Sequence, residues 1–121
     1  MFTFIRRFPL ILILLILWLF VSVALADDLV TAEVVRVVDG DSITVLAPGN
    51  QQIKIRLHGI DCPESGQAFG KRAKQFTSNQ CFGKTITYRR VDIDRYGRTV
   101  ATVYLDEGRE LNLEIIKAGY A

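Results

Sequence analysis

The chain has 121 residues, of which half are apolar and 23% are charged, so it can form one small domain but not several. Two of its 15 basic residues are Arg6 and Arg7, which leaves 13 basic and 13 acidic residues in the rest of the chain. This balance excludes a protein that binds nucleic acid through a large net positive charge, so any attraction to a polyanion must come from a few placed groups.

The N-terminal segment has the layout of a secretory signal peptide. Two arginines precede an uncharged apolar run at residues 10–21, and Ala24-Leu25-Ala26 offers a cleavage site. The alternative is an uncleaved membrane anchor, because residues 10–26 approach the length that spans a bilayer. We expect residues 1–26 to direct export to the periplasm or the medium, residues 27–121 to form the folded domain, and membrane contact only if the leader is retained.

Alternating apolar residues after the leader predict five short strands, separated by turns rich in Gly, Pro and Asp. In chain order these strands are Ala32–Val38, Ile43–Val45, Ile53–Leu57, Thr85–Val91 and Thr99–Leu105. Residues Gln67–Gln80 carry Phe69, Ala73, Phe76 and Gln80 at helical spacing, which predicts an amphipathic helix with these four side chains as its apolar stripe. Residues Asn112–Ala118, followed by Gly119, predict a short closing helix. A mainly β chain with this order of elements is typical of an OB-fold, a five-stranded barrel with one helix between strands 3 and 4.

The two cysteines are Cys62 and Cys81, 19 residues apart. In an exported domain of this size we expect them to form a disulfide, which would stabilise the fold by about 3 kcal/mol. The alternative is two free, partly buried thiols. With one His and two Cys in the whole chain, a four-ligand zinc site has too few soft ligands.

The second and third strands place acidic and basic groups together. A hairpin centred near Gly49 pairs residues whose numbers sum to about 98, which sets Asp41 opposite Leu57 and beside Arg56. Asp61 and Glu64 follow in the loop that leaves the same end of the hairpin. Three carboxylates at one place favour a hard divalent cation such as Ca²⁺ or Mg²⁺, and a guanidinium beside them can hold phosphate oxygens.

Each of these features has a plainer interpretation when taken alone. Asp39-Gly40-Asp41 is a common turn sequence, Arg56 could be an exposed strand residue, and Asp61–Glu64 could simply cap the following helix. We expect His58 to be a solvated or hydrogen-bonded strand residue without a catalytic role. The conjunction of the three features is what favours phosphodiester cleavage, in which a cation and an arginine neutralise charge and a carboxylate accepts a proton from water.

Three segments, in order, resemble the signatures of the staphylococcal nuclease (thermonuclease) family. They are Val38-Asp39-Gly40-Asp41-Ser42, Ile55–Glu64 and Asp94-Arg95-Tyr96-Gly97-Arg98, and the resemblance extends from about Ala32 to Ala121. It implies an OB-fold and a Ca²⁺-dependent nuclease that cuts single-stranded or frayed DNA and RNA to leave 3′-phosphate ends. Nucleic acid would be the substrate, and we expect a monomer without a protein partner.

The resemblance also implies roles for individual residues. Asp41 and Asp61 would bind Ca²⁺ through their carboxylates and Cys62 through its backbone carbonyl, while Glu64 would be the general base. Arg56 and Arg98 would hold the phosphate, and Arg95 and Tyr96 would contact a terminal phosphate or a neighbouring nucleotide. The loop after Glu64 is shorter than is usual in the family, and the sequence stops where family members continue into further tyrosines and a last helix. The expectations left open are therefore an active nuclease, an inactive truncated one, or a noncatalytic OB-fold module that binds single strands.

Overall fold

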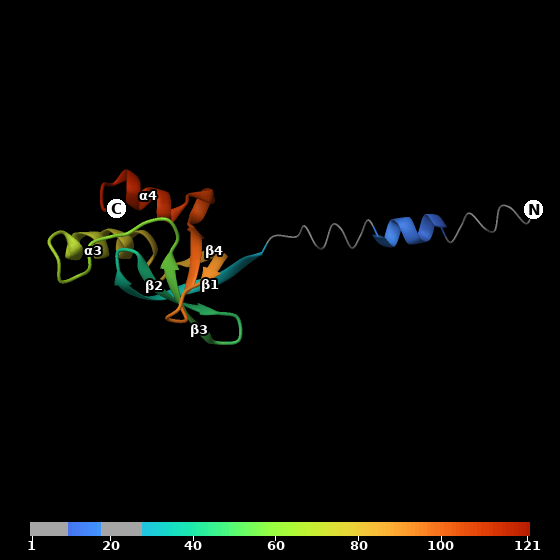
Figure 1. Cartoon of the computed structure of the whole chain (residues 1–121), viewed down its shortest axis with the longest axis horizontal. Coiled ribbons are helices and arrows are strands. Elements are labelled where there is room, and N and C mark those ends of the chain that lie inside the picture. Colours follow the sequence, from blue (N-terminus) through green and yellow to red (C-terminus); the bar gives the residue numbers. More distant parts are fainter. Residues whose placement is uncertain (1–9, 18–27) are drawn as a thin grey trace, which may run out of the picture.

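The structure, a computed structural model, describes residues 10–17 and 28–121 (Figure 1). Residues 10–17 form a helical segment with exposed side chains. Across the described ranges, no helix is both long enough and apolar enough to cross a membrane. The rest of the expected leader, including its cleavage site, lies outside the described residues, so a signal peptide or anchor stays a prediction.

The expected barrel is confirmed within the described part of the chain. Five strands close in the order β1-β2-β3-β5-β4, with antiparallel neighbours except for the parallel pair β3 and β5. Helix α3 lies between β3 and β4 in the sequence, and α4 follows β5 after a short 3₁₀ turn. The strands are β1 (Leu29–Asp39), β2 (Ser42–Ala47), β3 (Gln51–Leu57), β4 (Thr85–Ile93) and β5 (Thr99–Tyr104), and the helices are α3 (Gly70–Cys81), η1 (Asp106–Gly108) and α4 (Leu111–Lys117).

The barrel interior is filled by the inward-facing residues of the strands, because successive side chains of a strand point to opposite faces. Helices α3 and α4 pack against each other and against the barrel, on the side away from the β2–β3 hairpin (Figure 1). Both helices therefore add to one continuous core. Its most fully buried side chains include Val34, Ile43, Val45, Ile55, Leu57, Val103, Leu111 and Ile115.

Helix α3 differs in phase and start from the sequence-based expectation. It buries Gly70, Ala73, Thr77 and Cys81 rather than the expected stripe, and of that stripe only Ala73 is fully buried. Phe69 has a left-handed backbone with φ of 64° and an exposed side chain, so the helix begins at Gly70 and not at Gln67. The buried Thr77 hydroxyl, which donates to the Gly40 carbonyl at 2.6 Å, fixes the observed phase.

The expected disulfide is wrong, because Cys62 and Cys81 are separate, buried, free thiols. The Cys62 side chain lies beside Gly40 and Ala73, near the start of α3. Cys81 is at the last position of α3, eight residues beyond Ala73, or about 12 Å along the helix axis. Since a disulfide needs Cα atoms within about 7 Å of each other, the helix holds the two thiols too far apart to bridge.

Both thiols are expected to resist modification in the folded protein. Burial, reinforced for Cys62 by the Asp41 carboxylate, raises the pKa of Cys62 to about 11, and burial raises the pKa of Cys81 to about 12. The reactive thiolate is therefore scarce at neutral pH. A chromogenic disulfide reagent should label the native protein slowly and two thiols rapidly in denaturant, and reductant should leave the melting temperature unchanged. Absence of free thiols in denaturant would contradict this prediction.

Candidate active site

The β2–β3 hairpin has the expected register and brings Asp41 to Arg56. Ser42 pairs with Arg56, and the Leu57 amide donates to the Asp41 carbonyl at 2.8 Å. The side chains then meet, with Arg56 Nη2 3.3 Å from Asp41 Oδ2. The pairing follows from the alternation of β3, in which Ile55 and Leu57 face the core and Arg56 therefore faces outward.

Arg56 is held by four oxygens at the end of β3. Its Nη1 donates to the carbonyls of Leu57 and Ile60, at 3.1 and 2.8 Å, and its Nη2 lies 3.3 Å from one carboxylate oxygen each of Asp41 and Asp61. The two aspartates differ in exposure, since the Asp41 side chain is 9% exposed and the Asp61 side chain is 91% exposed. Arg56 thus joins a fixed, buried carboxylate to one that solvent or a ligand can reach.

Asp41 is fixed by the interior of the domain. Its Oδ2 accepts the Cys62 amide at 2.8 Å, and its Oδ1 accepts the Ser42 hydroxyl at 3.2 Å. The neighbouring Gly40 has no room for a side chain, because a Cβ there would lie 2.9 Å from the Cβ of Ala73. The turn that carries Asp41 is therefore pressed onto helix α3, and the carboxylate has little freedom to move.

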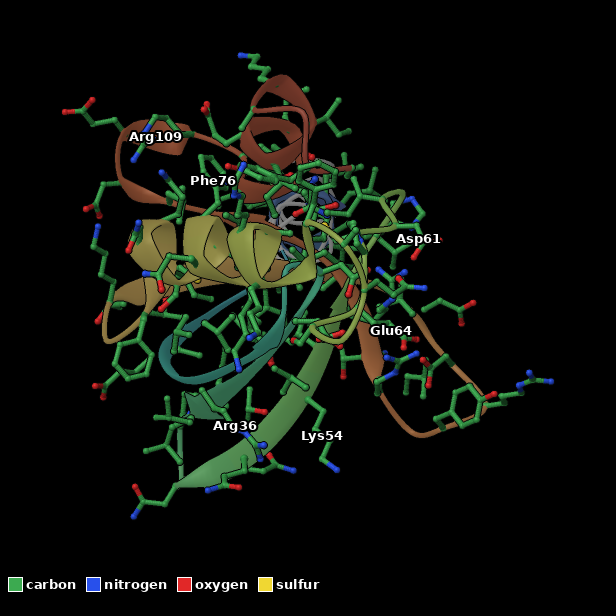
Figure 2. The ribbon with its side chains drawn as sticks, turned by 90° about the vertical axis from the view of Figure 1, so that its left-hand side faces the viewer. Arg36, Lys54, Asp61, Glu64, Phe76 and Arg109 are labelled. Carbon is green, nitrogen blue, oxygen red and sulfur yellow. The ribbon has the colours of Figure 1, made fainter. Side chains whose placement is uncertain are left out.

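Glu64 does not join the two aspartates. Its loop is tied down, since Asp39 Oδ1 accepts the Ser65 amide and hydroxyl at 3.1 and 2.6 Å, and the Glu64 amide donates to Gln67 at 2.9 Å. The Glu64 side chain is exposed and has no hydrogen bond or ion pair within the described structure. Figure 2 shows Glu64 on the same side of the molecule as Asp61. The structure thus brings two of the three carboxylates to Arg56 and leaves the third nearby.

The donor atoms at this place suit a hard cation. The carboxylates of Asp41 and Asp61 offer oxygens, whereas the Cys62 thiol packs beside Gly40 and Ala73 and only its backbone faces the site. Among the described residues, no group of three or more His, Cys, Asp or Glu side chains is arranged to hold a metal ion. The oxygen donors of Asp41 and Asp61 fit a hard cation such as Ca²⁺ in chemistry, and both carboxylates contact Arg56 in this structure.

The β4–β5 turn holds the second arginine of the site. Asp94 Oδ1 accepts the amides of Tyr96 and Arg98, both at 2.9 Å, and Asp94 Oδ2 accepts Arg98 Nε at 2.8 Å. Both terminal nitrogens of Arg98 stay without a hydrogen bond within the described structure. The guanidinium groups of Arg95 and Arg98 lie 5.0 and 5.6 Å from the centre of the exposed Tyr96 ring, and Arg95 also donates to the Tyr96 hydroxyl.

Acid should weaken this turn in a defined direction. Desolvation acts to raise the pKa of the Asp94 carboxyl, but the amides of Arg98 and Tyr96 and the Arg98 guanidinium outweigh it, so the pKa lies below its ordinary value of 3.8. Ionised Asp94 therefore stabilises the fold above pH 3.8, and this stabilisation is lost as the pH falls through the lowered pKa. The difference in unfolding free energy between the wild type and Asp94→Asn should shrink below pH 3.8. A difference that is independent of pH would contradict the assignment.

An open hollow of about 450 Å³ lies beside Arg56. Its walls come from the end of β3, the following loop, the β4–β5 turn and β5. Asp61 and Asp94 both line it, so the loop after β3 and the β4–β5 turn border a common space. The lining residues are Arg56, Leu57, Gly59, Ile60, Asp61, Asp94 and Val100.

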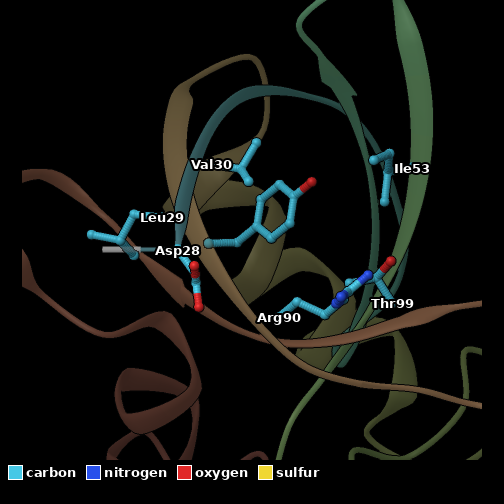
Figure 3. Close-up of a pocket in the computed structure, with 7 residues that line it drawn as sticks. Asp28, Leu29, Val30, Ile53, Arg90 and Thr99 are labelled. Carbon is cyan, nitrogen blue, oxygen red and sulfur yellow. The ribbon is translucent and has the colours of Figure 1, made fainter. Parts of the chain in front are cut away.

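A second hollow, of about 470 Å³, lies between the start of β1, β3, β4 and the start of β5. Figure 3 shows Arg90 extended toward Thr99 at its edge. The residues that line it are Asp28, Leu29, Val30, Ile53, Tyr88, Arg90 and Thr99. It contains none of the site residues expected from the sequence.

Sequence reasoning missed the residues that position the site. Asp94 was expected only as part of a turn, although the spacing of Asp94 and Arg98 across a turn containing Gly97 was a usable signal. Asn112 was expected only as the first residue of a helix, but its buried side chain binds backbone groups of β5 and of the segment after β3. His58 is exposed, as expected, and does not line the hollow.

Comparison with known proteins agrees with this geometry. The family described as staphylococcal nuclease homologue matches residues 54–121, which include all the expected site residues except Asp41. The chain is 44% identical over 91 residues to an "uncharacterized endonuclease" of Haemophilus influenzae, covering 75% of this chain and 51% of that protein. It is 50% identical over 72 residues to a micrococcal nuclease of Shigella flexneri (60% and 41% covered) and 39% identical over 100 residues to the thermonuclease of Staphylococcus hyicus (75% and 57% covered).

The chain spans about half the length of these curated relatives. The family match nevertheless covers more than half of this chain, and it includes β5, both helices, Arg56 and Arg98. Sequence, fold and site agree, and the chain belongs to the staphylococcal nuclease family.

Proposed function

We propose that this protein is an exported, Ca²⁺-dependent nuclease that hydrolyses phosphodiester bonds of single-stranded or frayed DNA and RNA and leaves 3′-phosphate and 5′-hydroxyl ends. Residues 27–121 would form the catalytic domain. The observation that carries the proposal is the contact of Arg56 Nη2 with both Asp41 and Asp61, 3.3 Å from each, beside an open hollow. The family relatives named as nucleases support the same reaction class.

Two arginines would hold the reacting phosphate: Arg56, which lines the hollow, and Arg98, whose partner Asp94 lines it. Arg98 is oriented through its Nε by Asp94 and keeps both terminal nitrogens for phosphate oxygens. A phosphate oxygen that enters the hollow would replace the exposed Asp61 carboxylate as a partner of Arg56 Nη2. The guanidinium groups would then offset the charge that builds on the phosphate oxygens in the transition state.

Glu64 would accept the proton of the attacking water. Its carboxylate is exposed, has no partner to give up within the described structure, and lies on a loop pinned to the Asp39 carboxylate. The water oxygen would form the new bond to phosphorus, the bond from phosphorus to the 5′ oxygen of the next nucleotide would break, and that oxygen would take a proton from solvent to become a hydroxyl. Asp41 and Asp61 would hold Ca²⁺, which when bound supplies positive charge to polarise the phosphate.

The test is fragment formation from denatured DNA by the purified full-length chain, with calcium or with excess chelator. We expect acid-soluble fragments with calcium and none with chelator. Phosphatase-sensitive 3′ ends would support the expected polarity of cleavage. A folded sample that releases no fragments at any calcium concentration would reject the proposal.

A noncatalytic module that binds single strands is the second candidate. It is favoured by the Glu64 side chain, which makes no hydrogen bond or ion pair within the described structure, and by the ion pairs of Arg56 with both Asp41 and Asp61, which already occupy those carboxylates in part. This candidate predicts binding of a labelled oligonucleotide that is equally strong with calcium and with chelator, and no fragments. Binding strengthened by calcium, together with cleavage, favours the nuclease.

A further inference from the structure

A basic groove, distinct from the hollow beside Arg56, crosses the outer face of β1, β2 and β3. It has a volume of about 280 Å³ and contains three basic side chains, Arg36 of β1, Lys54 of β3 and Arg98. Figure 2 shows Arg36 and Lys54 on the same surface of the barrel, away from α3 and α4. The remaining lining residues are Val38, Asp39, Ser42, Ile43, Thr44 and Ile55.

The strand register places Arg36 and Lys54 in one row across the sheet, next to the row that contains Arg56. Arg36 pairs with Thr44, and Thr44 pairs with Lys54, so the three side chains lie across three adjacent strands. The neighbouring row contains Ser42 and Arg56. Ser42 and Thr44 are two residues apart on β2, so the rows share one face and lie about 7 Å apart along the strands.

The charge of the groove is free to act on a ligand. Arg36 and Lys54 are exposed and have no hydrogen bond or ion pair within the described structure. Asp39, the acidic residue of the groove, already accepts two hydrogen bonds from Ser65. Thr44 also lines the groove, and its hydroxyl is the kind of donor that proteins direct at phosphate oxygens, whereas the Ser42 hydroxyl already donates to Asp41.

The groove and the hollow beside Arg56 share a boundary. Asp94 lines the hollow, Arg98 lines the groove, and the two side chains are bonded to each other at 2.8 Å. A chain of phosphates held at Arg56 could therefore continue past Arg98 toward Arg36 and Lys54. The charge balance of residues 27–121 makes such a local cluster the natural source of attraction.

We propose that Arg36 and Lys54 bind backbone phosphates of the nucleic-acid strand that lie next to the phosphate at which the strand is cleaved. This inference rests on the proposed function for its substrate class, and it makes a multi-nucleotide strand, rather than a single nucleotide, the ligand of the domain. Because the contacts go to phosphates, the groove adds affinity without selecting a base sequence.

The test is the salt dependence of binding, measured by fluorescence anisotropy with a labelled single strand of about 16 nucleotides. The full-length Glu64→Gln protein, with calcium present, would serve as the reference, because its expected cutting is slow enough for binding to be measured on the intact strand. Adding Arg36→Gln and Lys54→Gln should raise the Kd about tenfold at low salt and reduce the slope of log K against log salt by about 1.4, the value for two phosphate contacts. Each single substitution should remove about half of that slope.

The matched control carries Lys74→Gln and Arg109→Gln, which remove the same charges from an exposed site on α3 and from the turn before α4. Figure 2 shows Arg109 on the opposite side of the molecule from Arg36 and Lys54. The control should keep the reference slope, and cooperative melting should show that all variants fold. The proposal would be overturned if the Arg36/Lys54 variant kept the reference slope, or if the control lost as much of the slope as that variant.

Two further results separate this inference from the proposed function. Fragment formation by the wild type tests the nuclease, while the anisotropy measurement tests the groove even if nothing is cut. Competition by an acidic polypeptide as strong as that by a DNA strand of equal charge would show a general polyanion site and would also overturn the proposal.

Discussion

Glu64→Gln should lower the rate of DNA hydrolysis by about two orders of magnitude or more, with little change in the binding of a single strand. The amide keeps the size of the side chain but cannot accept the proton of the attacking water, and removal of a positioned general base costs about 10²–10⁴ in rate. The loop should stay in place, because its hydrogen bonds use the Glu64 backbone and not its carboxylate. Single-turnover cleavage at saturating calcium would measure the loss.

The control for this substitution is Glu33→Gln, which removes an exposed carboxylate from β1 without touching the hollow. It should cut DNA at close to the wild-type rate. Near-normal turnover by Glu64→Gln would remove this residue from the mechanism, while an equal loss in both variants would point to net charge and not to a base.

Asn112→Ala should cause the largest loss of stability. The buried Asn112 side chain accepts the Val103 amide at 3.1 Å and donates to the carbonyls of His58 and Ala101, at 2.9 and 3.3 Å. Alanine would leave the Val103 amide and the His58 carbonyl without this partner, while the Ala101 carbonyl would still accept the His58 amide at 2.9 Å. At about 1–3 kcal/mol for each buried group, we expect the unfolding free energy to fall by about 2 kcal/mol or more. Denaturant titration followed by circular dichroism would measure this change.

Asn79→Ala is the matched control, since Asn79 is exposed on α3 and its side chain accepts only a surface hydrogen bond from Gln75. It should change stability by about 0.5 kcal/mol or less. If Asn112→Ala cost no more than this control, the buried hydrogen bonds would not tie α4 to the barrel as the structure indicates.

The barrel and the Asp41–Arg56 contact were predictable because local signals determine them. The turn centred on Gly49 sets the β2–β3 register, and alternation in β3 decides that Arg56 faces outward. The phase of α3 was not predictable from apolar spacing, because a polar residue, Thr77, occupies a core position by bonding to the Gly40 carbonyl. Residue spacing and compartment suggested a disulfide, but neither reveals that the α3 helix separates the two cysteines.

Hydrogen bonds between segments that are distant in the chain could not be predicted from the sequence either. The hydrogen bond from the Ser65 hydroxyl to Asp39 joins a turn to a loop 26 residues later, and no local sequence pattern in either segment indicates it. The position of the Glu64 side chain could not be predicted for a related reason, because the expectation that three carboxylates converge ignored how the backbone of that loop is anchored.

The Gly40 turn is attached to α3, so the position of Asp41 in the site depends on how the protein interior is packed. Asp41, which contacts Arg56, lies on a turn whose Gly40 carbonyl accepts the Thr77 hydroxyl and whose Gly40 packs against Ala73. Thr77 and Ala73 are fully buried, so neither can touch nucleic acid. Partial opening of that helix would release the Asp41 turn, and with it the proposed activity would be lost while the sheet remained intact. Substitutions in α3 that change its packing, far from any nucleotide, should therefore change the proposed nuclease activity.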